Sequence, residues 1–190
     1  MIHTRRRLLK WGGVMAGLSA AGALMRPARA FGAVSPTRKG DAARRISLLN
    51  LHTAEKLELD YFRGDDYLPD AFAALRVLLR DFRNDEQHAI DPRLMDYLVE
   101  VAGRTGADPV FSVISGYRSP QTNEQLRERS AGVARHSLHL EGRAIDVRLA
   151  GVDCASLAAH ALDLKRGGVG YYRNSDFVHL DTGAFRTWKG

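Results

Sequence analysis

Cysteine is nearly absent from this chain of 190 residues, in which Cys154 stands alone. One cysteine cannot form an intramolecular disulfide, which excludes a disulfide-stabilised scaffold, and its small-residue helical context is typical of a buried side chain. Outside residues 11–25, no run approaches the ~18 consecutive apolar residues of a membrane-spanning helix. Hydrophobic residues make up 45% and charged residues 26% of the chain, which excludes a disordered protein and predicts one globular domain.

Acidic residues are missing from the first thirty positions, which contain six of the 28 lysines and arginines. The 22 basic residues that remain equal the 22 acidic residues of the chain, so the formal charge of +6 belongs to the N-terminal segment. The rest of the chain is neutral and lacks the positive charge that holds a protein on phosphates. We therefore expect no nucleic-acid partner.

Residues 1–30 have the pattern of an export signal. A basic stretch with adjacent arginines, residues 4–10, precedes the uncharged run 11–25 and a small-x-small cleavage site that ends at Ala30. The adjacent arginines resemble a twin-arginine signal, which predicts the twin-arginine translocase as a partner during export, cleavage after about Ala30 and a periplasmic location. Fifteen residues span only ~22 Å as a helix, so no stable membrane insertion is expected after cleavage.

The remaining chain divides into a flexible leader, residues 31–45, and one domain, residues 46–190. Apolar runs with alternation or β-branched residues predict strands, and apolar residues three and four apart predict helices. The strands are expected at 46–51, 55–62, 110–114, 144–149, 169–172 and 177–181. The helices are expected at 69–82, from 92 to a C-terminal glycine at 103 or 106, at 120–129 and at 154–165. Residues 130–142 are expected to form a loop. The predicted fold class is α+β, with helices packed on a small, mainly antiparallel sheet.

Two segments combine histidines with carboxylates. If the chain turns tightly at Gly142-Arg143, His139 lies opposite Asp146 across a hairpin, with Cβ atoms ~4.5–5.5 Å apart. His179, on a distant strand, would complete a set of three ligands. Two histidines and one carboxylate suit catalytic zinc, and they also suit non-haem ferrous iron.

Several motifs in a fixed order resemble the zinc D-Ala-D-Ala peptidase superfamily, which includes D,D-carboxypeptidases and VanX-type dipeptidases. The closest branch consists of small exported murein endopeptidases, and the resemblance covers roughly residues 45 to 190. The first two motifs are Ser115-Gly-Tyr-Arg118 and Ser137-x-His139-x-x-Gly142-x-Ala144-x-Asp146. The others are Gly-Val-Gly-Tyr-Tyr at 168–172, Asp176-x-x-His179, Phe-Val-His-Leu-Asp-Thr-Gly at 177–183 and Arg186-x-Trp188.

The resemblance implies a single domain with a zinc cleft and one Zn²⁺ per chain. It assigns three residues as zinc ligands: His139, Asp146 and His179. Arg118 would stabilise the oxygen of the attacked carbonyl or bind the substrate, and Ser137 would help to seat the substrate. Asp176 would be the general base.

The assignment of the base conflicts with strand periodicity. Side chains alternate along a strand, so Phe177, His179 and Asp181 share one face and Asp176 points away from it. Asp176 can act only if it precedes the strand, and Asp181 is then expected to hydrogen-bond a ligand. His136 lies near the motif without belonging to it, and we expect a solvated loop histidine.

The leading functional hypothesis is a periplasmic zinc metallopeptidase that hydrolyses the peptide cross-links of peptidoglycan. The alternatives are a D,D-carboxypeptidase or dipeptidase acting on free stem peptides, and a non-catalytic cell-wall-binding module stabilised by zinc. A binding module has no need for both Arg118 and Asp176, so their joint presence favours an enzyme.

Overall fold

The computed structural model describes residues 43–129 and 133–190, and the predicted export signal and most of the predicted leader lie outside this range. Arg44 and Arg45, which the sequence analysis placed in the leader, already belong to the first strand. The helices are α1 (Pro69–Leu78), α2 (Pro92–Thr105), α3 (Pro120–Arg129), η1 (Leu138–Glu141) and α4 (Cys154–Leu164). The strands are β1 (Arg44–Asn50), β2 (Lys56–Arg63), β3 (Asp66–Tyr67), β4 (Val110–Ser115), β5 (Ala144–Leu149), β6 (Gly168–Tyr172), β7 (Phe177–Asp181) and β8 (Arg186–Lys189).

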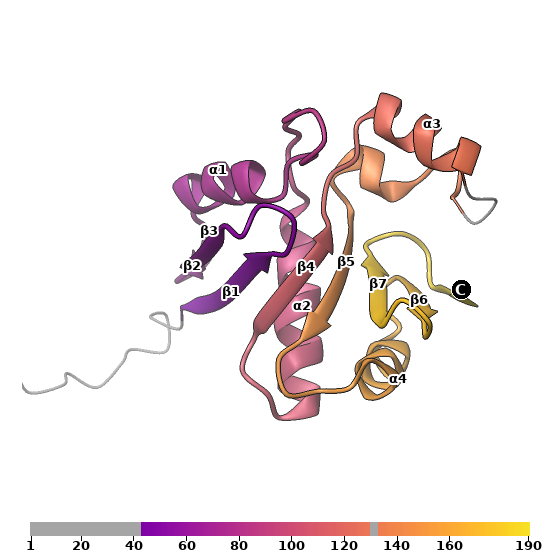
Figure 1. The fold of residues 1–190 in the computed structure, drawn as a ribbon. Coiled ribbons are helices and arrows are strands. Elements are labelled where there is room, and N and C mark those ends of the chain that lie inside the picture. Colours follow the sequence, from indigo (N-terminus) through magenta and orange to yellow (C-terminus); the bar gives the residue numbers. More distant parts are fainter. Residues whose placement is uncertain (1–42, 130–132) are drawn as a thin grey trace, which may run out of the picture. The chain divides into compact units, whose positions relative to one another are not determined.

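These strands form one mixed sheet in the order β3-β2-β1-β4-β5-β7-β6-β8 (Figure 1). The α+β class is confirmed, and five of the seven strand pairs in the described ranges are antiparallel, as expected. The sheet is larger than expected, with eight strands, and it is mixed because β1–β4 and β6–β8 are parallel pairs. The parallel pair β1–β4 forms because a long connection containing α1 and α2 returns the chain to the sheet in its original direction. Neither β3 nor β8 was expected from the sequence patterns.

Helix boundaries follow from local caps at one helix and from tertiary contacts at another. α2 begins after Asp91, whose side chain accepts a hydrogen bond from the main chain of Arg93, and it ends at Gly106 in the left-handed region. α1 ends at Leu78, whereas the sequence predicted a helix to residue 82. The carbonyl of the next residue, Leu79, accepts a hydrogen bond from the main-chain nitrogen of Tyr117. The segment after α1 is therefore bound to the loop that follows β4.

The core lies between the sheet and the helices α2 and α4, which contact each other and cover one face of β5 (Figure 1). Val147 on β5 and Val178 on β7 are paired and fully buried in this core. Their neighbours Asp146 and His179 are also paired, and alternation along a strand directs them to the opposite face of the sheet. The sheet thus places a polar pair on the face away from α2 and α4.

No helix within the described ranges has the length and apolar character needed to cross a membrane.

Candidate metal centre

His139 is placed by a short helix, and the expected hairpin is wrong. Residues 138–141 form η1, a 3-10 helix capped by Ser137, whose hydroxyl accepts a hydrogen bond from the main chain of His139. The helix ends at Gly142 in the left-handed region, where a Cβ atom would lie 2.0 Å from the carbonyl oxygen of Ala89. The chain therefore coils before β5, and residues 139 and 146 do not pair across a hairpin.

The cross-strand partner of Asp146 is His179. β5 and β7 are antiparallel with these two residues directly opposite each other, and β4 borders the other side of β5. Directly opposed residues in an antiparallel pair have neighbouring side chains on one face. η1 then brings His139 over the same face, so two neighbouring elements, η1 and β5, and the distant strand β7 supply the three side chains.

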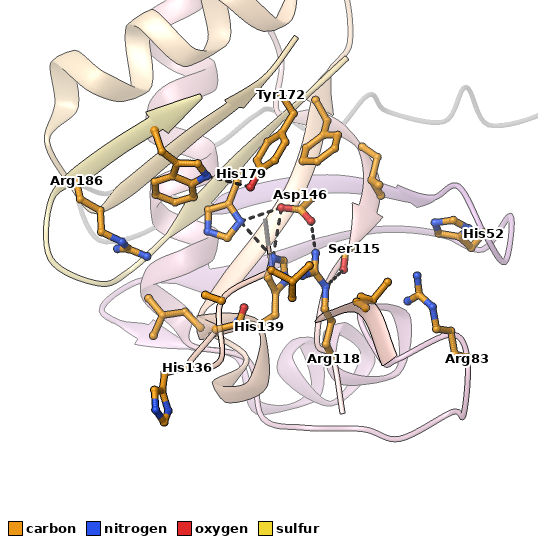
Figure 2. A pocket seen from close by; sticks show the side chains of 18 residues that line it. His52, Arg83, Ser115, Arg118, His136, His139, Asp146, Tyr172, His179 and Arg186 are labelled. Carbon is orange, nitrogen blue, oxygen red and sulfur yellow. Dashed lines mark hydrogen bonds and ion pairs between the residues drawn. The ribbon is translucent and has the colours of Figure 1, made fainter. Parts of the chain in front are cut away.

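The three predicted ligands form a compact group of donor atoms (Figure 2). Nε2 of His139 lies 3.2 Å from Nδ1 of His179, and Oδ1 of Asp146 lies 3.3 and 2.9 Å from these two nitrogens. Ligand atoms about 2.0–2.2 Å from a tetrahedral ion are separated by about 3.3–3.6 Å. All three residues are buried. The group fits a metal ion with one coordination position left for water or substrate.

Burial and neighbouring side chains shift the pKa values of two of the three predicted ligands. It lowers the pKa of His139 to about 4, assisted by the nearby positive charge of Arg118, so this imidazole is neutral at pH 7. Burial alone would raise the pKa of Asp146, but His139 and His179 hold the pKa of this carboxyl well below its usual range. A neutral imidazole and an ionised carboxylate are the forms that bind a metal.

Each histidine has its second ring nitrogen engaged by a hydrogen bond. Nδ1 of His139 donates to the carbonyl oxygen of Gly116 at 2.6 Å, and Nε2 of His179 donates to Oδ2 of Asp181 at 3.0 Å. Metal-bound histidines usually have such a partner, because it fixes the tautomer and the ring orientation. In a neutral ring, which is the form that binds a metal, the proton then lies on this second nitrogen, and the nitrogen that faces Asp146 is free to bind the ion.

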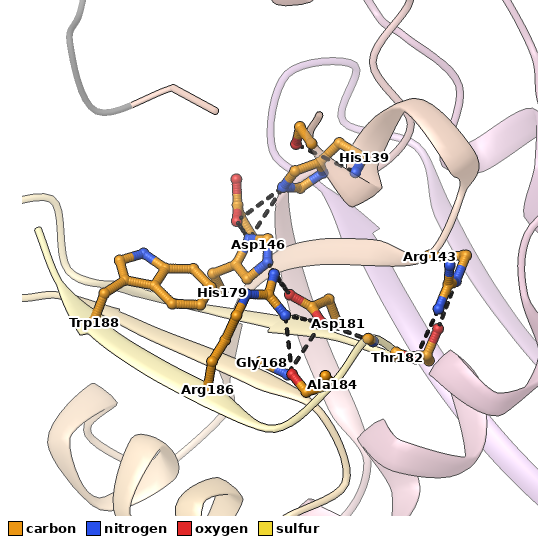
Figure 3. Close-up of polar contacts among 12 residues, drawn as sticks. His139, Arg143, Asp146, Gly168, His179, Asp181, Thr182, Ala184, Arg186 and Trp188 are labelled. Atoms are coloured by element: carbon orange, nitrogen blue, oxygen red, sulfur yellow. Dashed lines mark hydrogen bonds and ion pairs between the residues drawn. The ribbon is translucent and has the colours of Figure 1, made fainter. Parts of the chain in front are cut away.

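Asp181 is fully buried and holds His179 through a dense set of contacts (Figure 3). Its carboxylate accepts hydrogen bonds from the main-chain nitrogens of Gly168 and Gly183 and from both Nη atoms of Arg186, at 2.7 to 3.0 Å. A Cβ atom on Gly168 would lie 2.4 Å from Oδ2 of Asp181, so only glycine leaves room for the carboxylate. Burial alone would raise the pKa of Asp181, but the bonds from His179 and Arg186 lower it. Its acceptor positions are occupied, so this residue orients a ligand and is a poor base.

Asp181→Asn should weaken metal binding about 10- to 100-fold while the protein stays folded, because the amide can no longer accept all these hydrogen bonds and His179 loses its orientation. Competition with a chelator measures the dissociation constant. Asp163→Asn removes an exposed carboxylate of α4 and is the matched control. Unchanged affinity in Asp181→Asn would show that the contact with His179 has no role in metal binding.

Arg118 contacts the metal centre from the loop after β4. Its Nη2 donates to Oδ2 of Asp146 at 2.5 Å, and its Nε donates to the hydroxyl of Ser115 at 2.9 Å. Within the described residues, Nη1 has no hydrogen-bond acceptor, and Arg118 lines the pocket. The guanidinium thus orients a ligand with one edge and keeps donors for a substrate at its other end.

The metal centre opens into a cavity of about 620 Å³ (Figure 2). One wall is aromatic: Tyr172 stacks on Phe177 with ring centroids 4.5 Å apart, and the indole nitrogen of Trp188 donates to the hydroxyl of Tyr172 at 2.9 Å. His52 and Arg83 also line the cavity, and the sequence analysis gave neither a role. No local motif could find them, because the parallel pairing of β1 with β4 brings the loop after β1 beside the loop of Arg118.

The other predicted residues have different positions. Ser137 and His136 line the cavity. Asp176 lies in the turn before β7, as the base assignment requires, but it is not part of the cavity wall. Its side chain is 70% exposed and its carboxylate lies 3.2 Å from Nε of Arg148. The structure therefore brings together five of the six predicted site residues and leaves Asp176 beside Arg148.

Comparison with known proteins gives a family for this fold and site. Residues 38–188 match the family model described as peptidoglycan L,D-endopeptidase MepK. The peptidoglycan L,D-endopeptidase MepK of Escherichia coli strain K12 is 41% identical over 184 residues, which cover 97% of this chain and 96% of the relative. The probable peptidoglycan L,D-endopeptidase MepK of Haemophilus influenzae is 36% identical over 189 residues, covering 99% and 97%. No solved structure matched the chain.

The mixed sheet with its buried His-Asp-His group, together with these matches, defines the protein as a metallopeptidase. The chain belongs to the peptidoglycan L,D-endopeptidase MepK family, a branch of the zinc D-Ala-D-Ala peptidase superfamily. The resemblance drawn from the sequence motifs is thereby confirmed.

Proposed function

We propose that this protein is a periplasmic zinc endopeptidase that hydrolyses L,D peptide cross-links of peptidoglycan after export by the twin-arginine translocase and removal of residues 1–30. The observation that carries the proposal is the buried group of His139, Asp146 and His179, with donor atoms 2.9 to 3.3 Å apart, at the base of an open cavity. The relatives named above are peptidoglycan L,D-endopeptidases, which supports the choice of substrate.

Zinc is the metal we propose for this centre. Two imidazoles and one carboxylate with an open position form a common catalytic zinc site. When bound, zinc would provide Lewis acidity and a water that ionises near neutral pH. Asp181 and the carbonyl of Gly116 would keep the two imidazoles in the required tautomers.

The remaining chemistry falls to residues around the centre. Asp176 is proposed to accept the proton of the attacking water and to pass it to the leaving amine, which requires its carboxylate to leave Arg148 and turn toward the cavity. Arg118 is proposed to donate from Nη1 to the carbonyl oxygen as negative charge develops on it. Ser137, on the cavity wall beside His139, is proposed to help seat the peptide.

The shape of the cavity favours an endopeptidase over the alternatives. In Figure 2, His52 and Arg83 lie on one side of the metal centre and Arg186 lies on the other, so lining residues extend in both directions from the scissile bond. An internal cross-link needs room on both sides, whereas a carboxypeptidase needs a closed end that binds a terminal carboxylate. A binding module would require neither the cavity nor the donors of Arg118.

Digestion of purified muropeptides tests the proposal. We expect zinc-loaded protein to convert L,D-cross-linked dimers into monomers and to release no D-Ala from uncross-linked pentapeptides, with products identified by mass. Dimers with D,D cross-links are the matched control substrates and should remain intact. Release of D-Ala alone would identify a carboxypeptidase, and intact dimers in the presence of zinc-loaded protein would favour the binding module.

A further inference from the structure

The cavity has more positive than negative side chains. Of the described residues, three arginines line it, against a single carboxylate, that of Asp146. Arg118 is paired with Asp146 and Arg186 is paired with Asp181. For Arg83 the nearest carboxylate is that of Asp81, 4.0 Å away. Among residues 43–129 and 133–190, no atom accepts a hydrogen bond from its guanidinium, which therefore keeps all its donors.

Arg83 is nevertheless held in place. Its main-chain nitrogen donates to Oδ1 of Asp81 at 3.1 Å, and the carboxylate of Asp81 is fully buried. Its guanidinium carbon lies 4.1 Å from the centre of the Phe82 ring, and Phe82 itself stacks on His52 with ring centroids 3.8 Å apart. An arginine beside an aromatic ring retains the fork of donors that matches a carboxylate. The side chain is 36% exposed, so a ligand can reach it.

Asp81 also connects Arg83 to the metal centre. Its Oδ2 accepts hydrogen bonds from the main-chain nitrogen and the hydroxyl of Ser119, both at 2.9 Å, and Ser119 directly follows Arg118. The segments that carry Arg83 and Arg118 are thus joined through a buried carboxylate. Figure 2 shows Arg83 on the side of the metal centre opposite Arg186. The main chain that carries the guanidinium of Arg83 is therefore fixed relative to the loop of Arg118.

We propose that Arg83 binds a free carboxylate of the substrate and makes the enzyme selective for a cross-link with an acidic group on that side of the scissile bond. The inference rests on the proposed function, which supplies a peptide of this chemistry. A diaminopimelate residue that is cross-linked through an amine retains a free carboxylate on the same carbon atom. Arginine and carboxylate form two parallel charge-assisted hydrogen bonds, which select both charge and geometry.

Equilibrium binding tests the role of Arg83 without depending on turnover. Zinc-loaded Asp176→Asn protein is titrated by calorimetry with the L,D-cross-linked dimer and with the same dimer whose diaminopimelate carboxylates are amidated. We expect the acidic dimer to bind about 10- to 100-fold more tightly, the range for a hydrogen-bonded ion pair shielded from water. Adding Arg83→Gln should remove this preference, and Arg83→Lys should restore only part of it because an ammonium lacks the fork.

Arg104→Gln is the matched control, because Arg104 is exposed in the last turn of α2. It should leave the preference intact. In otherwise wild-type protein, Arg83→Gln should raise KM for the acidic dimer by the same factor and change kcat by less than about twofold. A preference that survives Arg83→Gln in a folded protein would overturn the inference. An Arg83-dependent preference in a protein that cuts no dimer would uphold it and refute the proposed function instead.

Discussion

Wild-type protein purified without added metal should contain one zinc per chain, and the double variant His139→Ala, His179→Ala should contain none. The reason is that these two imidazoles supply two of the three donor atoms, and Asp146 alone cannot retain the ion. Elemental analysis measures the metal content. His160→Ala, which removes a histidine of α4, is the matched control and should keep its zinc.

Thermal unfolding gives a second measure of the same site. Zinc at about 100 times its dissociation constant stabilises the folded state by about 2.7 kcal/mol, which should raise the Tm of a domain of this size by roughly 5–10 °C. The double variant should show no such shift. Stoichiometric zinc in the double variant, or iron in place of zinc in the wild-type protein, would refute the proposed centre.

Asp176→Asn should lower kcat by about 10²- to 10⁴-fold without loss of zinc or fold, because it removes the proposed base. Steady-state hydrolysis of the cross-linked dimer, with the metal content measured on the same samples, tests this. Asp181 offers no alternative base, since it is fully buried and its carboxylate is bound by His179, Arg186 and two main-chain nitrogens.

Arg148→Gln is the control that separates catalysis from structure. Arg148 contacts the carboxylate of Asp176 and also donates to the carbonyl oxygens of Ser175 and Asp176. If Asp176 serves only to hold this turn, Arg148→Gln should reduce kcat as much as Asp176→Asn does. If Asp176 is the base, Arg148→Gln should retain most of the activity. Equal losses in the two variants would contradict the base assignment.

Local signals in the sequence were sufficient to predict several of the helices and strands. The β1–β2 hairpin follows from two apolar runs on either side of a short turn, the second of which alternates strictly, and α2 follows from the cap at Asp91 and the left-handed residue at Gly106. In each case the determining residue lies within a few positions of the boundary that it sets. The same holds for the cap of α4 at Asp153.

The candidate ligands were also identified from the sequence, but their arrangement was not. The motifs named His139, Asp146 and His179, and the structure brings these three side chains together. The expected route through a tight hairpin was wrong because Gly142 ends η1, and Asp146 pairs with His179 across the sheet. A ligand set can be inferred from residue types in order, whereas its register depends on which strands become neighbours.

Tertiary structure alone decided the surroundings of the metal centre. The parallel pairing of β1 with β4 places His52 on the cavity wall, and Asp81 fastens Arg83 to the loop of Arg118. β8, which the sequence did not reveal, places Arg186 on Asp181. The contact of Asp81 with Ser119 joins residues 38 positions apart, and the sequence near each residue contains no information about its partner. Arg186 and Asp181 are five positions apart, but their contact depends on the pairing of β8 with β6. They form because burying a carboxylate requires hydrogen-bond donors, and folding brings the donors from distant segments.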